Sequence, residues 1–509
     1  MTPILALDSL SVALPPGADR QLAVADLTFS VRRGETLCII GASGSGKSVL
    51  ASAMMGSLAP GLRVTAGNVT LGGTRLTGLP EPALRQLRGN RIALIPQEPV
   101  AALNPLTTIG KQVAEVFEIH GGATPDRLTS RVTELLESVA LHPALAQRYP
   151  YQLSGGECQR VAIAVAIAMA PDVLIADEAT TALDTVTQAQ IIALLAQIKR
   201  RTPHGLVFIS HDIGVVGQIA DRIAVIDQGR IVEIGSARDV LDTPQHSVTR
   251  AMIAATRPRM ARSLRQATAP RLVINGLDKN YGARVAVADI NLSLGAGQTL
   301  AIVGASGSGK SSLARMIVQL ITPDRGLITV DGIDLPHVPR GTVQMVFQDS
   351  WGALNPRRSV GAGIARAAEL AGADRPVARA HAHELLALVG LSPDAFDRYP
   401  SAFSGGQRQR IAIARALAMR PRVLICDESV SGLDPLAQRQ ILSLLEDLQK
   451  RSGFAMLFIT HDLRTAAAIA DQIIVMARGR IVEGGEAVGV LTSPQSNAAK
   501  TLVAAMSGA

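Results

Sequence analysis

One eight-residue segment occurs twice in this chain of 509 residues, and it restricts the possible folds more than any other feature. Residues 41–48 are Gly-Ala-Ser-Gly-Ser-Gly-Lys-Ser, and residues 304–311 repeat them without a change. Both copies match the phosphate-loop pattern of Gly, four residues, Gly, Lys and Ser or Thr. An apolar, strand-like run precedes each copy and a helix-like run follows it. The sequence therefore predicts two phosphate-binding loops, each between a strand and a helix.

The residue types in this segment explain how it can hold a phosphate. Glycines let the backbone turn until several N–H groups point at one phosphate, and the following helix directs its positive end there. The lysine adds a charge for the β- and γ-phosphates, and the last serine can hold Mg²⁺. The predicted nucleotide-binding residues are Gly41, Ser43, Gly44, Ser45, Gly46, Lys47 and Ser48 in the first copy, and Gly304, Ser306, Gly307, Ser308, Gly309, Lys310 and Ser311 in the second.

The rest of the chain is duplicated as well. A serine, an aspartate and a histidine at positions 154, 177 and 211 recur 250 positions later. The spacing differs only earlier, because the first half is longer between its phosphate loop and Gln97. We therefore predict two related domains, at residues 1–246 and 271–509, joined by a linker at residues 247–270 that is rich in Arg, Ala and Pro.

Strand-like and helix-like segments alternate within each half. In the first half the strand candidates include residues 91–95, 173–176, 206–209 and 223–226, and the helix candidates include residues 127–140, 158–169 and 187–199. This alternation predicts an α/β fold, in which helices cover a parallel sheet. Ligands of such sheets bind at the carboxyl ends of the strands, where both phosphate loops would lie.

In each half, one buried strand ends in two acidic residues. They are Asp177 and Glu178 in the first half, and Asp427 and Glu428 in the second. An aspartate beside a phosphate loop can hold the Mg²⁺ shell, and the adjacent glutamate can accept a proton from an attacking water. Acids at strand ends are often simply solvated, but their recurrence in both halves favours a nucleotide site.

A Ser-Gly-Gly turn lies 23 residues before the acidic pair in both halves. Residues 153–157 are Leu-Ser-Gly-Gly-Glu, and residues 403–407 are Phe-Ser-Gly-Gly-Gln. With the phosphate loops and the acids, these turns make the chain similar to ATP-binding-cassette (ABC) ATPases that have two cassettes fused in one polypeptide. The resemblance implies two tandem P-loop NTPase cassettes, each with a mostly parallel sheet core, a helical subdomain and an antiparallel β part.

The resemblance also implies that the signature of one cassette closes over the ATP held by the phosphate loop of the other. Lys47 would then work with Ser404, and Lys310 would work with Ser154. The signature residues expected to contact nucleotide are Ser154, Gly155 and Gly156 in the first cassette, and Ser404, Gly405 and Gly406 in the second.

The other family positions match in both halves. Asp184 and Asp434 resemble the D-loop aspartates that cross between sites, and Tyr281 resembles the aromatic residue that stacks on adenine. The residues that the family implies for catalysis are Glu178 and Glu428, the switch histidines His211 and His461, and the Q-loop residues Gln97 and Gln348. Those implied for Mg²⁺ are Ser48, Gln97, Asp177, Ser311, Gln348 and Asp427.

The chain departs from the family pattern at four positions. Leu14 lies near the position that Tyr281 occupies in the second half, so adenine stacking in the first half is weaker or comes from elsewhere. Glu157 replaces the usual glutamine of the signature, and Ala179 and Ser429 replace the usual proline after the catalytic glutamate. None of these changes removes a group needed for hydrolysis, so we predict two competent sites.

Further motifs are similar to the dipeptide, oligopeptide and nickel importer group. They are Ala-Leu-Asn-Pro at 102–105 and 353–356, Arg-Tyr-Pro at 148–150 and 398–400, and the tail at 244–251. The resemblance implies an ATPase subunit peripheral to the cytoplasmic face of the bacterial inner membrane. It would bind two transmembrane permease subunits and act indirectly with a periplasmic or surface solute-binding protein. Peptides are the first expected solute, with nickel or metal chelates and glutathione as alternatives.

The same group implies where the permease subunits would touch this chain. Contacts are expected after the Q-loops, near residues 99–108 and 350–358. Trp351, the only tryptophan, is either one of these contacts or part of the packing of the helical subdomain.

Composition limits the competing classes of function. The chain is 47% hydrophobic with a mean hydropathy of +0.25, yet no apolar run approaches the ~20 residues of a membrane span, which excludes an exporter with fused spans. The remaining class is a soluble twin-cassette ATPase acting on ribosomes or DNA. The short linker, three widely spaced cysteines and 3% aromatic content disfavour it, and we expect no nucleic-acid partner.

Overall fold

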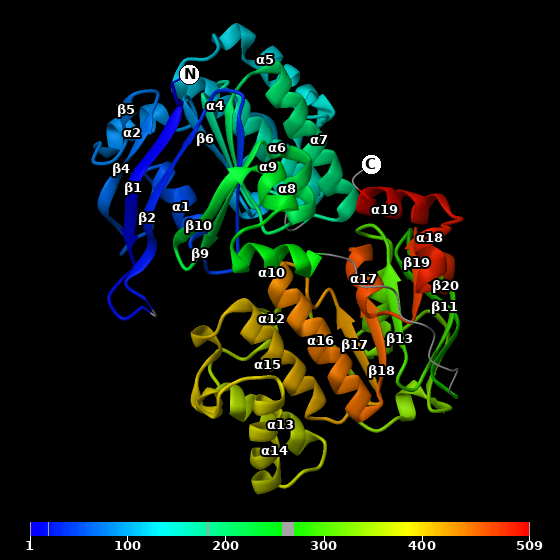
Figure 1. Ribbon diagram of the computed structural model, residues 1–509. Helices are drawn as coiled ribbons and strands as arrows, with labels where there is room; N and C mark the ends of the chain where they lie inside the picture. Colours follow the sequence, from blue (N-terminus) through cyan, green and yellow to red (C-terminus); the bar gives the residue numbers. More distant parts are fainter. Residues whose placement is uncertain (1, 19, 181–182, 257–268, 508–509) are drawn as a thin grey trace. The chain divides into compact units, whose positions relative to one another are not determined.

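The computed structural model describes residues 2–18, 20–180, 183–256 and 269–507. The chain divides into two compact units: unit 1 comprises residues 1–183 and 187–256, and unit 2 comprises residues 257–509 together with 184–186. Within the described residues, each unit contains a six-stranded sheet, a four-stranded sheet and a set of helices (Figure 1). None of the described helices is long and apolar enough to cross a membrane.

The larger sheet of unit 1 is parallel except at one edge. Its strands are β3 (Thr36–Gly41), β6 (Ile92–Ile95), β7 (Val173–Asp177), β8 (Gly205–Ile209), β9 (Arg222–Asp227) and β10 (Arg230–Ser236). They are arranged in the order β10-β9-β3-β8-β7-β6, and only β10 runs antiparallel to its neighbour. Because β3 is central and β7 is two strands away, the ends of these strands share one edge of the sheet.

The smaller sheet of unit 1 is antiparallel. It contains β1 (Leu5–Ala13), β2 (Leu22–Val31), β4 (Arg63–Leu71) and β5 (Thr74–Arg75), in the order β2-β1-β4-β5. The helices of unit 1 are α1 (Lys47–Met54), α2 (Glu81–Leu87), α3 (Pro99–Ala102), α4 (Ile109–His120), α5 (Pro125–Ser138), α6 (Gly155–Ile167), α7 (Thr185–Arg201), α8 (Ile213–Ile219), α9 (Ala237–Asp242) and α10 (Ser247–Thr256), with short 3₁₀ turns at Pro143–Gln147 and Pro150–Gln152.

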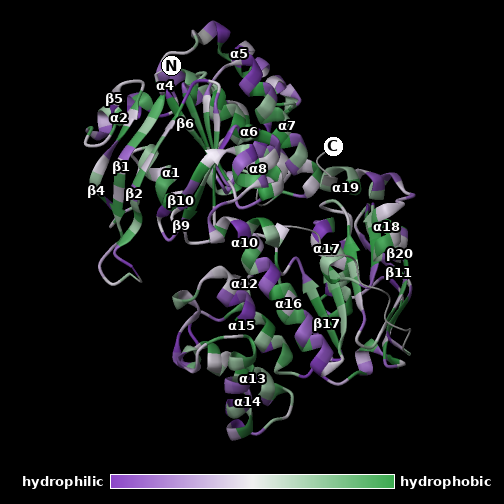
Figure 2. Cartoon of the chain, in the orientation of Figure 1, coloured by the Kyte–Doolittle hydropathy of each residue, from purple (hydrophilic) through white to green (hydrophobic). Residues whose placement is uncertain are grey.

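Strand β3 contributes side chains to two separate cores. Cys38 and Ile40 pack in the cluster that contains the buried faces of α4 to α7. Leu37 and Ile39 point to the other face and pack with α1 and the antiparallel sheet. In Figure 1 the antiparallel strands and the helices α5 to α7 accordingly lie on opposite sides of the parallel sheet, and Figure 2 shows the strands at the centre of the parallel sheet as predominantly hydrophobic.

Unit 2 repeats this architecture. Its larger sheet has the order β16-β17-β18-β13-β19-β20, with β13 (Thr299–Val303), β16 (Val343–Val346), β17 (Val423–Asp427), β18 (Ala455–Ile459), β19 (Gln472–Ala477) and β20 (Arg480–Glu486). Its antiparallel sheet contains β11 (Pro270–Tyr281), β12 (Arg284–Gly295), β14 (Arg325–Val330) and β15 (Ile333–Asp334). Its helices are α11 (Lys310–Ile317), α12 (Ser350–Ala353), α13 (Val360–Leu370), α14 (Arg375–Leu388), α15 (Gly405–Leu417), α16 (Pro435–Ser452), α17 (Leu463–Ile469), α18 (Ala487–Thr492) and α19 (Asn497–Ser507), with 3₁₀ turns at Leu335–His337, Pro393–Asp397 and Pro400–Ala402.

The predicted fold class is confirmed, because both units combine a mostly parallel sheet with helices and an antiparallel β part. The segment expected to be a linker is only partly described. Residues 247–256 form α10 within unit 1, whereas residues 257–268 lie outside the described part of the chain. The limits of the two domains stay a prediction.

Each unit ends in a turn that a glutamate holds closed. Glu233 on β10 accepts the backbone N–H groups of Gln245 at 2.8 Å and of His246 at 3.0 Å. Glu483 on β20 binds the backbone of residues 495–496 in the same way, at 2.9 Å and 2.7 Å. These carboxylates hold the turn just before the last described helix of each unit.

Candidate functional site

The phosphate loop of unit 1 joins β3 to α1 through positions that admit no side chain. Gly46 has a φ of 102°, and a Cβ there would lie 2.4 Å from the carbonyl oxygen of Ala23. A Cβ at Gly41 would lie 2.3 Å from the carbonyl oxygen of Ile226. Both distances are far below van der Waals contact, so only glycine fits, and the loop leaves a cradle that a phosphate can enter.

The lysine of each phosphate loop bends back over that loop. Lys47 Nζ donates to the carbonyl oxygens of Gly41 at 2.8 Å and of Ala42 at 2.9 Å. Lys310 Nζ makes the equivalent bonds in unit 2, at 2.7 Å and 2.9 Å. Both lysines are 5% exposed, and burial lowers the pKa of the Lys310 amine. An anion beside each ammonium group would offset this cost, so the loops suit a phosphate chemically.

The helices that follow the loops begin without a side-chain cap. The N-cap residues of α1 and α11 are Gly46 and Gly309, and neither position has a side-chain hydrogen bond to the first helical N–H groups. Such N–H groups need an acceptor, and the helix dipole favours an anionic one. The start of each helix therefore adds to the phosphate site.

We predict that alanine at Gly309 destabilises unit 2 by about 2–3 kcal/mol. The φ of Gly309 is 105°, and the new Cβ would lie 2.3 Å from the carbonyl oxygen of Ala286. Gly363 in α13 is the matched control, because a Cβ there meets nothing within 4 Å and alanine favours a helix. Urea unfolding of the full chain measures both variants. Equal free energies of unfolding for the two would contradict the predicted clash.

A serine and an aspartate meet beside each phosphate loop. The Ser48 hydroxyl donates to Asp177 Oδ1 at 3.5 Å in unit 1, and the Ser311 hydroxyl donates to Asp427 Oδ1 at 3.4 Å in unit 2. Burial raises the pKa of both aspartates, which are 9% and 7% exposed. A cation would offset the cost of keeping these carboxylates charged. Oxygen ligands of this kind, together with phosphates, are what Mg²⁺ selects.

The predicted catalytic side chains converge on the glutamate next to each aspartate. In unit 1 the Gln97 amide donates to Glu178 Oε2 at 2.9 Å, and His211 Nδ1 lies 3.6 Å from Glu178 Oε1. In unit 2 the corresponding distances to Glu428 are 3.1 Å from the Gln348 amide and 3.4 Å from His461 Nδ1. The structure therefore brings together residues that lie up to 114 positions apart in the first half and 113 in the second.

The backbone of both glutamates is strained. Glu178 has a φ of 46° and Glu428 a φ of 47°, in the left-handed region that residues with a side chain rarely adopt. Such a conformation costs of order 1–3 kcal/mol and persists where the surroundings impose it, often at functional sites. Here it follows the end of the buried strands β7 and β17 and turns the carboxylate toward the Q-loop amide.

We predict that the contact between Glu428 and His461 stabilises unit 2 most at mildly acidic pH. Burial raises the pKa of Glu428, but the hydrogen bond and charge of His461 outweigh it, so this pKa lies below its ordinary value of 4.5. Burial lowers the pKa of His461, but Glu428 outweighs it, so that pKa lies above 6.5. Both members of the pair are then mostly charged between pH 4.5 and 6.5.

The stabilisation has an acidic and a basic limit. It is lost as the pH falls through the lowered pKa of Glu428, and also as the pH rises through the raised pKa of His461. We compare the free energy of unfolding of the full chain with that of the His461→Gln variant. Their difference should be about 1 kcal/mol larger inside this pH window than outside it. A difference that stays constant from pH 5 to pH 9 would contradict the ion pair.

The predicted signature residues lie at the start of long helices. Ser154 is the N-cap of α6 and Ser404 is the N-cap of α15, and each side chain accepts the N–H of the residue three positions later. Asp434 caps α16 by accepting the N–H of Ala437 at 2.9 Å. Asp184 immediately precedes α7, and residues 181–182 lie outside the described part of the chain.

The sequence did not point to Arg20, which lies over the first phosphate loop. Its guanidinium donates to the carbonyl oxygen of Gly44 at 2.6 Å. In unit 2, Arg284 approaches the equivalent residue, because a Cβ on Gly307 would lie 3.3 Å from the Arg284 side chain. The recurrence of an arginine near the start of the second strand of each unit was the available signal. Tyr281, the predicted adenine-stacking residue, ends β11 and is 47% exposed.

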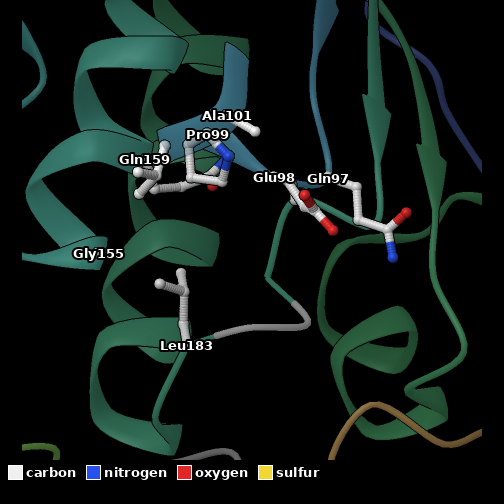
Figure 3. A pocket seen from close by; sticks show the side chains of 9 residues that line it. Gln97, Glu98, Pro99, Ala101, Gly155, Gln159 and Leu183 are labelled. Carbon is white, nitrogen blue, oxygen red and sulfur yellow. The ribbon is translucent and has the colours of Figure 1, made fainter. Parts of the chain in front are cut away.

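A cavity of about 380 Å³ adjoins the Q-loop of unit 1. Gln97 and Glu98 line it from one side, and Gly155 and Gln159 of α6 line it from another (Figure 3). The remaining lining residues are Pro99, Val100, Ala101, Ala179 and Leu183. Gln97, which is predicted to be catalytic, and the predicted signature helix α6 therefore border one cavity, and a ligand bound there would touch both.

These features define a P-loop nucleotide-binding protein with two phosphate loops, each beside its own acid, amide and imidazole groups. The sequence profile of the family described as ABC transporter matches residues 24–181 and 287–431. The chain belongs to the ABC transporter family. It is an ATPase of that family, and ATP is the nucleotide of the phosphate loops.

The chain is similar over nearly its whole length to curated transport proteins. It is 40% identical to the peptidoglycan transport ATP-binding protein YejF of Agrobacterium fabrum, over 99% of this chain and 96% of that protein. It is 38% identical to the glutathione import ATP-binding protein GsiA of Escherichia coli K12, over 99% and 89%. One solved ATP-binding cassette, described as bound to ADP and Pi, is 27% identical and covers 46% of this chain and 99% of its own length, with a TM-score of 0.42. The prediction of two fused ABC cassettes is confirmed.

Proposed function

We propose that this chain is the ATP-hydrolysing subunit of an importer that carries peptides across the bacterial inner membrane. The observation that supports this most is that both units keep a complete hydrolytic set: lysine, serine, aspartate, glutamate, glutamine and histidine. Full-length similarity to transport proteins for peptidoglycan and glutathione supports import of peptide-like solutes. Glutathione and metal chelates are the alternative solutes.

We propose two composite sites, in which each signature turn meets the ATP of the other unit. Lys47 would work with Ser404, and Lys310 with Ser154. Mg²⁺ would be held by Ser48 and Asp177 in unit 1 and by their counterparts Ser311 and Asp427 in unit 2, where it would neutralise charge on the phosphates. Support comes from the exposure of both signature serines, whose helices offer their positive ends outward.

In each unit the side chains around the glutamate divide the remaining work. Glu178 is placed to accept the proton of the attacking water, because its carboxylate lies at the strand end beside the aspartate. Gln97 donates to that carboxylate and can orient the water, and His211 approaches it from the carboxyl end of the adjacent parallel strand β8. Neither unit would act alone, since each lacks the signature of its partner until the two close.

We propose that two transmembrane permease subunits contact the segments after the Q-loops, and that the chain is thereby held at the cytoplasmic face of the membrane. Support comes from apolar side chains left exposed there: Leu106 is 85% exposed and Trp351 is 48% exposed. The cavity beside Gln97 opens in the same region of unit 1. A permease segment bound in this cavity would contact Gln97 directly, so its movement could shift a proposed catalytic residue.

Purification from membranes tests the partners. The tagged full chain is extracted from the producing bacterium in mild detergent, and co-purifying proteins are identified by mass spectrometry. Proteins with several membrane spans are expected. Ribosomal proteins or DNA in their place would contradict import and favour the soluble twin-cassette class.

Uptake tests the solute. A strain lacking the gene is supplied with labelled dipeptide, muropeptide, glutathione or nickel chelate. Restored uptake of peptides by the wild-type chain, but not by a chain with both Glu178→Gln and Glu428→Gln, is the expected result. Restoration of glutathione or nickel uptake alone would replace peptides as the solute.

A further inference from the structure

The two signature turns have matching backbones but different charges. The third residue of the helix is Glu157 in α6 and Gln407 in α15. The next residue is Cys158 in α6 and Arg408 in α15. Unit 1 thus has a negative side chain where unit 2 has a neutral one, and a neutral side chain where unit 2 has a positive one.

In unit 1 the hydroxyl group of Ser154 is hydrogen-bonded to the carboxylate of Glu157. Ser154 Oγ donates to Glu157 Oε2 at 2.8 Å, and the backbone N–H of Ser154 donates to the same oxygen at 2.7 Å. The N–H of Glu157 in turn donates to Ser154 Oγ at 3.3 Å. A serine hydroxyl has a single donor proton, so this one is already held by a carboxylate within its own turn.

In unit 2 the signature hydroxyl keeps its proton available. The Gln407 amide oxygen accepts the backbone N–H of Ser404 at 3.0 Å, and the N–H of Gln407 donates to Ser404 Oγ at 3.3 Å. Within the described part of the chain, no side chain accepts the proton of this exposed hydroxyl. The same helical cap therefore forms in both units, but only in unit 1 does the serine hydroxyl donate its hydrogen bond to the side chain at the third helical position.

The arginine of unit 2 lies beside its signature turn. The Arg408 guanidinium donates to the carbonyl oxygen of Phe403 and lies 5.1 Å from the centre of the Trp351 ring. Its nearest nitrogen would be 4.0 Å from a Cβ placed on Gly405. This positive charge is next to the turn that would meet a triphosphate, and Cys158 supplies no such charge in unit 1.

We propose that Glu157 makes the signature of unit 1 the weaker ligand for the γ-phosphate, and that Gln407 with Arg408 makes the signature of unit 2 the stronger one. To bind a phosphate, Ser154 must give up a charge-assisted hydrogen bond, and the carboxylate repels the anion. This proposal rests on the proposed composite sites. On that pairing, the closed state holds ATP less tightly at residues 304–311 than at residues 41–48.

The test measures retained ATP at each phosphate loop separately. The full chain with Glu178→Gln and Glu428→Gln is loaded with 8-azido-ATP, washed, cross-linked by light and digested. Peptides from each half are quantified by mass spectrometry. Glu157→Gln should slow release from the loop at 304–311 about tenfold, which corresponds to about 1.4 kcal/mol, with no change at the other loop.

The matched variant is Gln407→Glu, which gives unit 2 the residue of unit 1. It should speed release from the loop at 41–48 about tenfold and leave the other loop unchanged. Both substitutions keep the hydrogen bonds that cap the helix, so equal midpoints of thermal unfolding are expected for the variants and the parent chain.

The variants Ser154→Ala and Ser404→Ala distinguish a failure of the composite sites from a failure of the proposed role of Glu157. If Ser404→Ala speeds release from residues 41–48 but Glu157→Gln changes neither loop, the composite sites stand and the role of Glu157 is overturned. If neither serine variant changes release from either loop, the composite sites themselves are overturned. Slower release from residues 41–48 in Glu157→Gln would refute the pairing of the units, and the proposal with it.

Discussion

Replacing Glu178 or Glu428 with glutamine should slow ATP turnover about tenfold or more, and replacing both should slow it about 100-fold or more. We propose each carboxylate as the proton acceptor of its site, and it accepts a hydrogen bond from a glutamine amide at 2.9 Å in unit 1 and at 3.1 Å in unit 2. A single substitution should lower the ATPase rate by more than half, because one site that cannot hydrolyse ATP would keep the two units closed and so stop the other site as well. Phosphate release by the purified chain measures the rate.

ATP binding provides the control for this result. Glutamine preserves the size of the side chain, so the variants should still bind ATP and unfold at the same temperature as the parent chain. Glu134→Gln on α5 is a matched control, because Glu134 is an exposed partner of Arg131 and should not affect turnover. If one of the two catalytic changes leaves the rate intact, that site does not hydrolyse ATP.

Replacing Lys310 with alanine should weaken ATP binding at unit 2 by about 10- to 100-fold. On the proposed role, the ammonium group would donate charge-assisted hydrogen bonds to the phosphates, and it already donates to the carbonyl oxygens of Gly304 and Ala305 at 2.7 Å and 2.9 Å. The loop thus loses both its charge and its shape. Because ligand binding stabilises the folded state, the rise in melting temperature caused by ATP should shrink as well.

Lys450→Ala is the control for charge alone. Lys450 lies in the last turn of α16, where it is exposed and 3.7 Å from Asp447. Its loss should leave the affinity for ATP unchanged. Titration with a fluorescent ATP analogue, with Lys47→Ala as the equivalent change in unit 1, measures all three variants. Unchanged affinity in Lys310→Ala would mean that this loop does not bind triphosphate.

The sequence was sufficient for those parts of the site that depend on local patterns. The phosphate loops require glycines at fixed spacings, and the acids follow buried strands whose ends share one edge of the sheet. Both properties are visible without coordinates. The family resemblance named Gln97 and His211 as site residues, but their contacts with Glu178 came only from the structure.

Features that depend on tertiary packing were missed. Residues 247–256 have the composition of a linker, yet they form α10, because Met252 is buried in the core beneath the helical layer. The left-handed backbone of Glu178 has no sequence signal, since glutamate rarely adopts it and its surroundings impose it. Arg20 was missed because a single arginine in a hairpin loop is ordinarily a solvated residue.

Strand β3 packs into two hydrophobic cores at once, and this connects the phosphate loop to both layers of unit 1. Alternate side chains of this strand belong to two different cores, and the strand ends at Gly41, where the phosphate loop begins. Close-packed interiors transmit small displacements rather than absorbing them. A displacement of the helical layer by a bound partner, or of the antiparallel layer, therefore moves the same end of β3. We expect the affinity for ATP to change with a displacement of either layer.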